Sequence, residues 1–159
     1  MSEAENIAIV RRFYAEVFDR QNLELADSLV APQFKNHTGP AGMQDGPEGI
    51  KALVRMLFAA FPDDRHDIED IFAAGDRVAV RQRHHGTHAG PFLGLPPTGN
   101  HVSQAEIHVI RLEEGRLVEH WGCRDDVGFL RQMGAPEVVK VQDAGAPVSP
   151  LAGTVAQAR

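Results

Sequence analysis

The chain of 159 residues is long enough for one domain with a single hydrophobic core. Its composition, 43% hydrophobic and 24% charged, is typical of a soluble globular protein, and its net charge of -6 argues against nucleic acid as a partner, because phosphate binding needs clustered Lys and Arg. No segment approaches membrane-spanning length, and the lone cysteine, Cys123, indicates a reducing compartment. We therefore expect a cytoplasmic protein with no membrane partner.

The first half of the sequence predicts helices. Ser2 and Glu5 have the spacing of a capping box, and apolar residues recur behind them at helical spacing. Pro47 is suited to the first turn of a later helix, which has to stop before Pro62. The predicted helices are Glu3 to Asp19, Leu23 to Val30, and a third over 47–61.

From Asp64 onward the period changes from helical to alternating, which predicts strands. The segment Glu113-Glu114-Gly115 suits a three-residue hairpin loop, with Gly115 in the left-handed conformation. A short helix is expected from Asp126 to Met133. The predicted strands are Asp67 to Ala73, Arg77 to His85, Val102 to Leu112 and Arg116 to Arg124.

Helices followed by an antiparallel meander predict an α+β fold. We expect a cone-shaped α+β barrel, in which a strongly curved antiparallel sheet wraps around the N-terminal helices and encloses a pocket for a small ligand. Residues 1–134 form the single predicted domain. Residues 135–159 are small residues and Pro without periodicity, which predicts a tail that is disordered or held only by a partner subunit.

The last two strands carry titratable groups on one face. With a three-residue loop, His108 is expected opposite His120 and Glu106 opposite Gly122, all on the same side of the sheet. The other side is apolar, with Ile107, Val109, Leu117, Trp121 and Cys123. Either this apolar side is the core, or helices cover the polar side as a pocket and the apolar side packs against a second subunit.

Three motifs in chain order, GTH-x-GPFLG-x-PPTG, E-I-H-x-x-R-x-x-x-G-R-x-V-E-H-W and D-x-G-x-L-x-Q-x-G, resemble the SnoaL-like polyketide cyclase and ester cyclase family. This family belongs to the superfamily that includes nuclear transport factor two, ketosteroid isomerase and limonene epoxide hydrolase. The resemblance implies that the polar side of the last strands lines a cavity and that the outer face of the sheet forms a homodimer.

The family's antibiotic-pathway cyclases pair a His on the penultimate strand with an Asp on the last strand, and close a ring by an aldol reaction without metal or cofactor. The resemblance places the His at His108. Gly122 stands where the Asp is expected, and the nearest acids are Asp125 and Asp126. This departure weakens the cyclase assignment.

Four residues are candidate catalytic groups. His108 suits acid–base chemistry, because an unperturbed imidazole titrates near neutrality, or it is a structural strand His. His120 is a second pocket His or a cross-strand partner, and two facing imidazoles cannot both be charged easily. Asp125 is a candidate general base, whereas Asp126 is suited to capping the last helix. Glu106 either orients His108 or accepts a proton itself.

Other residues are candidates for binding substrate, and core packing or chain capping is the alternative role for each. They are Tyr14, Asn36, His37, Phe58, His84, Phe92 and Arg124. No metal site is expected, because His84 and His85 point to opposite faces of a strand. The GPFLGLPPTG run lacks the Lys of a phosphate loop and is interpreted as a rigid crossing over the pocket mouth.

The leading interpretation is a cofactor-free enzyme that removes a proton next to a carbonyl, followed by aldol or ester ring closure or isomerisation. Its partner is then a small apolar or carbonyl-containing molecule. One alternative is an epoxide hydrolase, for which Arg124 and Glu106 supply part of the machinery. The other is a dimeric small-molecule carrier or sensor, which Gly122 in place of an acid favours.

Overall fold

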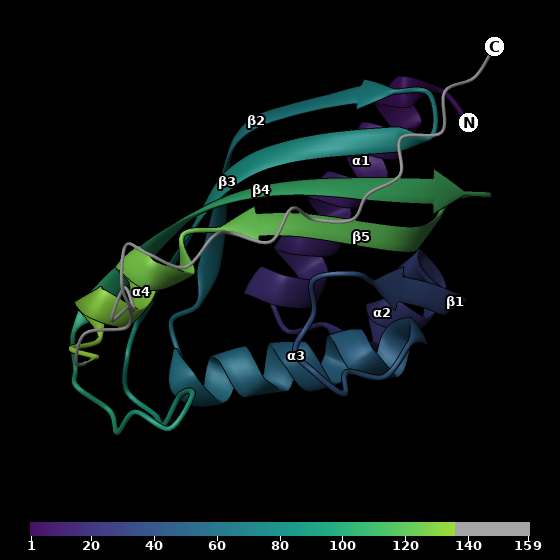
Figure 1. The fold of residues 1–159 in the computed structure, drawn as a ribbon. Coiled ribbons are helices and arrows are strands. Elements are labelled where there is room, and N and C mark those ends of the chain that lie inside the picture. The colour runs from purple at the N-terminus through teal and green to yellow at the C-terminus, as the bar shows by residue number, and fades with distance from the viewer. Residues whose placement is uncertain (136–159) are drawn as a thin grey trace, which may run out of the picture.

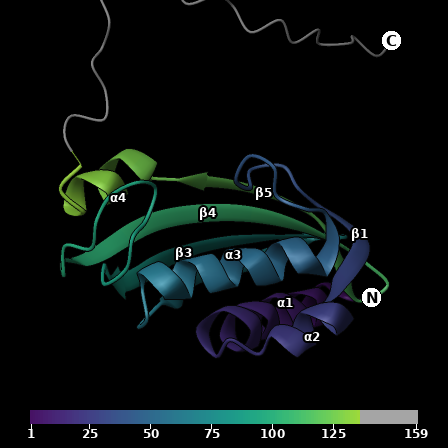
Figure 2. The same ribbon diagram turned by 90° about the horizontal axis from the view of Figure 1, so that it is seen from below.

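The computed structural model describes residues 1–135, so the predicted tail lies almost wholly outside the described residues. The fold is α+β, with one layer formed by a curved five-stranded sheet in the order β1-β5-β4-β3-β2. Figures 1 and 2 show that α1, α2 and α3 lie on one face of this sheet, with α4 at the far end of β4 and β5. The helices are α1 Glu3–Arg12, η1 Phe13–Asp19, α2 Leu23–Leu29, α3 Gly46–Ala60 and α4 Asp126–Gln132. The strands are β1 Val30–Asn36, β2 Arg65–Ala74, β3 Arg77–Thr87, β4 His101–Glu113 and β5 Arg116–Arg124.

The first helix starts where it was predicted to start, but its second half is not a regular α-helix. Ser2 accepts a hydrogen bond from the Glu5 backbone N–H, and the Glu5 carboxylate accepts one from the Ser2 N–H at 2.7 Å, so the capping box is present. After Arg12 the helix widens into the π-helix η1. Phe13, Tyr14, Val17 and Phe18 of η1 are all buried in the core.

The sheet is mixed, which corrects the fully antiparallel arrangement expected from the sequence. Strands β2 to β5 pair antiparallel, whereas β1 runs parallel to β5, with Asn36 beside His120. Residues 30–36 therefore form an edge strand, although Val30 was expected to end a helix. Pro32 is tolerated there, because an edge strand has one side without ladder hydrogen bonds.

The hairpin between β4 and β5 is tighter than predicted. Glu113 pairs with Arg116, so the loop has the two residues Glu114 and Gly115, both with positive φ. Two-residue turns of this kind match the twist of the strands. A bulge lies between Arg111 and Leu112. On the side of the bulge away from the turn, His108 pairs with Gly122 rather than with His120. The expected pairing was therefore two residues out of register.

A shift of two residues keeps each side chain on its predicted face, because strands alternate with period two. Gln104, Glu106 and His108 are buried under the helices, whereas Ile107 is 53% exposed on the outer face. Leu117 is the exception. The bulge turns it into the core, where it is 1% exposed, although it was expected on the outer face.

Residues 88–100 cross from β3 to β4 over the end of α3. The backbone N–H groups of Ala89 and Gly90 donate to the carbonyl of Ala60 at 2.9 and 3.0 Å. A Cβ atom at Gly90 would lie 1.9 Å from the carbonyl oxygen of Ala59, so this approach requires glycine. The crossing brings Phe92 and Leu93 to the mouth of a cavity.

Candidate active site

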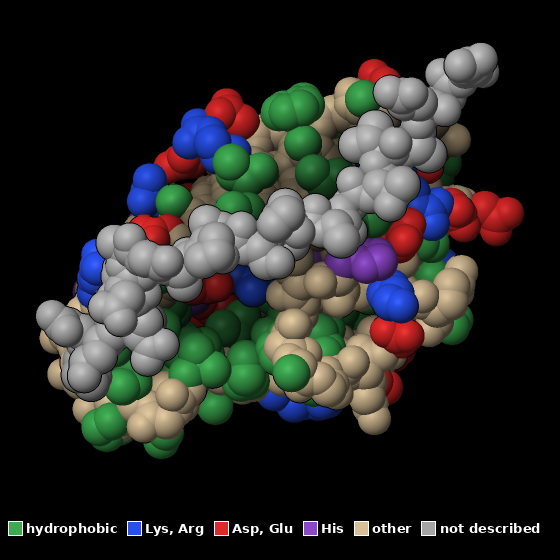
Figure 3. Space-filling view, viewed as in Figure 1, with side chains coloured by type: hydrophobic (Ala, Val, Ile, Leu, Met, Phe, Trp, Pro, Cys, Tyr) green, Lys and Arg blue, Asp and Glu red, His purple; other side chains and the backbone are tan. Residues whose placement is uncertain are grey.

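A cavity of about 400 Å³ lies between the sheet and the helices. Most of its wall is apolar, with aromatic and aliphatic side chains from η1, β1, α3, α4 and the 88–100 crossing. Figure 3 shows hydrophobic side chains gathered between the sheet and α3. The polar lining comes mainly from the strands. It consists of Asn36, His66, Gln82, His84, Gln104, Glu106, His108, His120, Arg124 and Asp126, together with the phenol of Tyr14.

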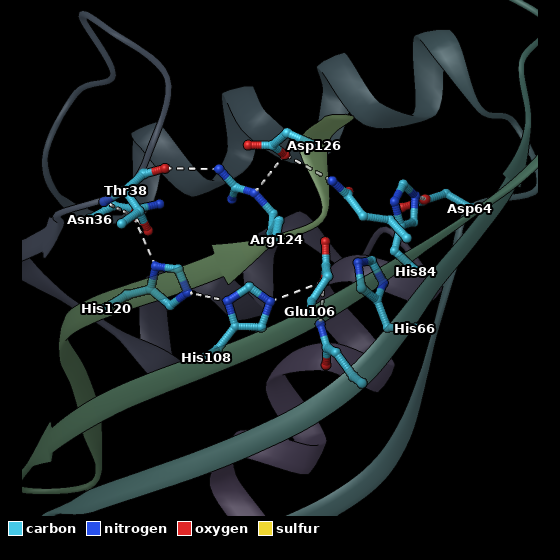
Figure 4. A network of polar contacts seen from close by, with 12 residues as sticks. Asn36, Thr38, Asp64, His66, His84, Glu106, His108, His120, Arg124 and Asp126 are labelled. Atoms are coloured by element: carbon cyan, nitrogen blue, oxygen red, sulfur yellow. Dashed lines mark hydrogen bonds and ion pairs between the residues drawn. The ribbon is translucent and has the colours of Figure 1, made fainter. Parts of the chain in front are cut away.

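Four side chains form a continuous row of hydrogen bonds along this wall (Figure 4). Glu106 Oε2 lies 3.0 Å from His108 Nε2, and His108 Nδ1 lies 2.9 Å from His120 Nε2. His120 Nδ1 lies 2.8 Å from Asn36 Oδ1. Gln82 adds a donor at the Glu106 end of the row, since its amide nitrogen lies 2.9 Å from Glu106 Oε2. The β4–β5 pairing and the parallel β1 strand together build the row.

Burial and neighbouring charges set the ionisation of the row. Burial alone would raise the pKa of Glu106, but the hydrogen bond and positive charge of His108, together with His66 and Gln82, lower it to about 2. Burial, followed by the positive charge of His108, lowers the pKa of His120 to about 3. Near neutral pH, Glu106 is therefore a carboxylate and His120 is a neutral imidazole.

The direction of each hydrogen bond then follows. Asn36 Oδ1 also accepts the backbone N–H of Thr38 at 3.1 Å, which identifies it as an acceptor, so His120 Nδ1 must donate to it. Neutral His120 consequently accepts at Nε2, and His108 donates from Nδ1. Because the carboxylate of Glu106 can only accept, His108 donates from Nε2 as well. His108 carries protons on both nitrogens and is an imidazolium.

Gly122 provides the space for this contact. A Cβ atom at position 122 would lie 2.7 Å from His108 Nδ1 and 3.2 Å from Thr38 Oγ1. Any larger residue there would displace the His108 ring from His120. The position at which the family resemblance led us to expect an acid therefore accommodates the paired imidazoles.

A second polar cluster lies on the same wall, at the β2 and β3 side. His84 Nε2 contacts the carboxylate of Asp64, and both side chains are buried, at 3% and 0% exposure. The ring of His84 stacks on His66 with the ring centres 5.2 Å apart. His66 Nδ1 lies 3.0 Å from Asp19 Oδ1. Burial lowers the pKa of His66, but the hydrogen bond to Asp19 and the charges of Asp64 and Glu106 outweigh it, and the net shift is upward.

Arg124 and Asp126 lie at the end of the row near α4. Arg124 donates to the Thr38 carbonyl at 3.1 Å and lies 3.5 Å from Asp126 Oδ1. The same oxygen of Asp126 accepts from Gln104 at 2.8 Å. Figure 4 shows this group beside Glu106. Tyr14 lies beside the row, with its ring centre 6.1 Å from that of His108, and burial followed by the charge of Glu106 raises the pKa of its phenol, so it remains a hydrogen-bond donor.

The structure brings most of the predicted site residues together. Glu106, His108, His120, Tyr14, Asn36, His84, Phe92 and Arg124 all line the cavity. Three predicted residues are not among its lining. Asp125 caps α4, because its carboxylate accepts the Gly128 N–H at 2.9 Å, so the helix cap is Asp125 and not Asp126 as predicted. His37 stacks on Trp121 at 4.7 Å, and Phe58 packs against the main core.

Sequence reasoning missed Gln82, His66, Asp64 and Asp126. Gln82 had a signal, because Val78 and Val80 are core residues of the same strand and period two puts 82 and 84 on their face. Asp64 had none, because it lies in the turn between α3 and β2. Within residues 1–135, no three His, Cys, Asp or Glu side chains are arranged to hold a metal ion. None of the helices described is long and apolar enough to cross a bilayer.

The family model described as SnoaL-like polyketide cyclase matches residues 8–133. Aklanonic acid methyl ester cyclase DnrD of Streptomyces peucetius is 36% identical over 93 residues, which are 57% of this chain and 63% of that relative, less than two thirds of its length. Nogalonic acid methyl ester cyclase of Streptomyces nogalater is 29% identical, over 75% of this chain and 90% of that relative.

Solved structures have the same fold. TsrD from Streptomyces laurentii superposes with a TM-score of 0.78 over 86% of this chain and 99% of that chain, at 24% identity. IdmH from Streptomyces antibioticus superposes with a TM-score of 0.71 over 82% of this chain and 99% of that chain, at 32% identity.

Proposed function

Because this chain belongs to the SnoaL-like polyketide cyclase family, we propose that it closes a ring in a small carbonyl compound by an intramolecular aldol-type reaction, without cofactor. The observation that carries the proposal is the row of hydrogen bonds that holds His108 between Glu106 and His120 on the wall of a mostly apolar cavity, from which the imidazolium form of His108 is inferred. A buried, preoriented positive charge stabilises a developing enolate far more effectively than the same charge in water.

The reaction needs no co-reactant. A base on the cavity wall takes the proton from the carbon next to a carbonyl, and the C–H electron pair becomes an enolate. The charge of His108 offsets the enolate charge, and the phenol of Tyr14, whose ring centre lies 6.1 Å from that of His108, is a neutral donor. The enolate carbon then bonds to a second carbonyl carbon of the same molecule. The resulting alkoxide takes the proton back, so substrate and product are isomers.

The cavity limits the substrate. A volume of about 400 Å³ is within the range of sites for drug-sized molecules, and the apolar lining at the mouth, including Met56, Leu93 and Leu130, suits a flat or aliphatic apolar body. The relatives described above are named as cyclases of aklanonic acid methyl ester and of nogalonic acid methyl ester. We propose an ester of a keto acid as the substrate class.

The two alternative functions have less support. A carrier was expected to have a cavity without an acid, yet Glu106 lies within hydrogen-bond distance of His108. An epoxide hydrolase needs a carboxylate, a water and an Arg that act together. Arg124 is instead held by the Thr38 carbonyl and Asp126, and Glu106 is held by His108 and Gln82.

Ring closure is tested by incubating the purified protein with an aromatic keto ester that carries a second carbonyl, with a metal chelator present. We expect a product of unchanged mass to form at least 100-fold faster than in buffer, the usual scale of acid–base catalysis. Product is followed by chromatography with mass detection. Tight binding of the ester without conversion is the result expected of a carrier, and it would contradict the proposal.

The predicted homodimer and cytoplasmic location are proposals of the same kind. The outer face of the sheet supports the dimer, because Phe72 and Ile107 are 63% and 53% exposed on it. Figure 3 shows hydrophobic side chains over β2 and β3 among charged ones. The single Cys123, which is exposed, is compatible with a reducing compartment.

A further inference from the structure

The proposed reaction needs a base with a free lone pair that faces the cavity, and four imidazoles line the wall. His108 donates from both nitrogens, and His120 is engaged at both. His66 donates from Nδ1 to Asp19. Burial lowers the pKa of His66, but the bond to Asp19 and the charges of Asp64 and Glu106 raise it by more, which favours a second proton on Nε2. His108 and His120 therefore have no lone pair to offer, and the upward shift in the pKa of His66 makes its remaining lone pair less available.

His84 differs from the other three. Its Nε2 is bound to Asp64, which is an acceptor when ionised, so the proton of a neutral His84 lies on Nε2. Its Nδ1 forms no hydrogen bond with any residue of 1–135, and this atom is not fully buried. Because His84 lines the cavity, Nδ1 presents a lone pair there.

The surroundings hold His84 in one orientation. Phe61 meets its ring edge-on at 5.7 Å, Phe129 lies at 5.3 Å, and His66 stacks on it in nearly parallel planes, 15° apart. A His oriented at one nitrogen by a buried carboxylate, with the other nitrogen open to the substrate, has the geometry of a general base.

The buried charges are consistent with this role. The carboxylate of Glu106 is matched by His108, and that of Asp19 is matched by His66. Asp64 is the third carboxylate, and its Oδ2 is buried with no hydrogen-bond partner. A proton arriving at His84 would complete the third ion pair, which makes this position favourable for temporary storage of a proton.

We propose that His84 is the general base of the ring closure and that Asp64 is its positioning residue, an inference that rests on the proposed function. His84 Nδ1 takes the proton from the carbon next to the carbonyl, and the electrons of that bond form the enolate. Asp64 stabilises the imidazolium that results. After the new carbon–carbon bond has formed, the alkoxide recovers the proton from Nδ1, so no proton is gained or lost.

Proton abstraction is tested separately from ring closure by using an aryl β-keto ester with no second carbonyl. In D₂O, the loss of its α-proton signal is followed by NMR above the rate in buffer. We expect wild type to accelerate exchange and His84→Gln to lower kcat for exchange about 100-fold. Gln retains a donor for Asp64, so this variant avoids leaving a buried carboxylate unpaired.

Further variants separate the chemical role from a structural one. Imidazole added to His84→Ala is expected to restore part of the exchange, and Asp64→Asn is expected to lower kcat about 10-fold with KM unchanged. The matched control is His85→Gln, whose side chain lies on the opposite face beside Asp67, and which should exchange like wild type.

The outcomes distinguish the two proposals. If the wild type accelerates exchange and folded His84→Gln exchanges at the same rate, the role of His84 is overturned and the proposed function stands. Absence of exchange in wild type, with the ester bound, would overturn the proposed function and the base assignment with it.

Discussion

Replacing Glu106 by Gln is expected to lower kcat for ring closure about 100-fold. His108 would lose the positive charge that stabilises the enolate, and one preorganised contact of that kind contributes about this factor. The variant keeps an oxygen that can accept from both His108 and Gln82, so the packing is preserved. What it removes is the negative charge that holds His108 as an imidazolium. The measurement is the initial rate with the keto ester, beside thermal unfolding.

Glu119→Gln is the matched control for this change. Glu119 is a carboxylate on β5 that pairs with Arg111 and His37 at the surface, with its side chain 28% exposed. Exposed ion pairs contribute about 0–1 kcal/mol to stability, so the control should keep both fold and turnover. If folded Glu106→Gln turned over as fast as Glu119→Gln, the charge of Glu106 would have no part in catalysis.

Replacing Gly122 by Ala is expected to lower kcat by about 10-fold to 100-fold and to destabilise the fold by about 1–3 kcal/mol, the usual cost of overpacking a close-packed interior. The new methyl group would lie 2.7 Å from His108 Nδ1 and 3.1 Å from His108 Cε1. To relieve the clash the ring must turn, and the contact with His120 is lost. The φ angle of Gly122 is not positive, so the effect comes from space rather than from backbone strain.

Cys123→Ala tests the specificity of that effect. Cys123 is the next residue on β5, exposed on the outer face, and its truncation leaves the row of hydrogen bonds untouched. We expect wild-type turnover from this variant. Wild-type turnover from Gly122→Ala would show instead that the His108–His120 contact is dispensable.

The position of Gly122 also explains the departure from the family pattern that the sequence alone left open. The absence of a side chain at 122 allows His108 and His120 to meet at 2.9 Å. In this chain the last strand contributes an imidazole from 120 where the resemblance led us to expect a carboxylate from 122. An Asp at 122 would occupy the space of the His108 ring, so we expect Gly122→Asp to lose activity rather than gain it.

The sequence predicted the faces of β4 and β5 better than their pairing. Period two alone assigns Glu106, His108 and His120 to one side, and this assignment survives any register shift of two residues. The pairing depends on the length of the turn and on the bulge between Arg111 and Leu112. Neither can be predicted from the alternation of apolar and polar residues. Leu117 was misplaced for the same reason.

Parts of the fold that depend on long-range contacts were not predictable. Local helical periodicity contains no sign of the change from α1 to η1. The choice between Asp125 and Asp126 as helix cap depends on one backbone step, because both precede the same helix. His84 was predicted to bind substrate, but Asp64, its partner, lies 20 residues away in a turn.

The protonation of His108 is the central claim, and NMR of the ring nitrogens measures it directly. At pH 7 we expect protons on both nitrogens of His108, and on Nδ1 alone of His120. Since the pKa of His120 is lowered to about 3, His120 should stay neutral as the pH falls from 7 to 5. A single protonated nitrogen on His108 at pH 7, or charging of His120 between pH 7 and 5, would contradict the account.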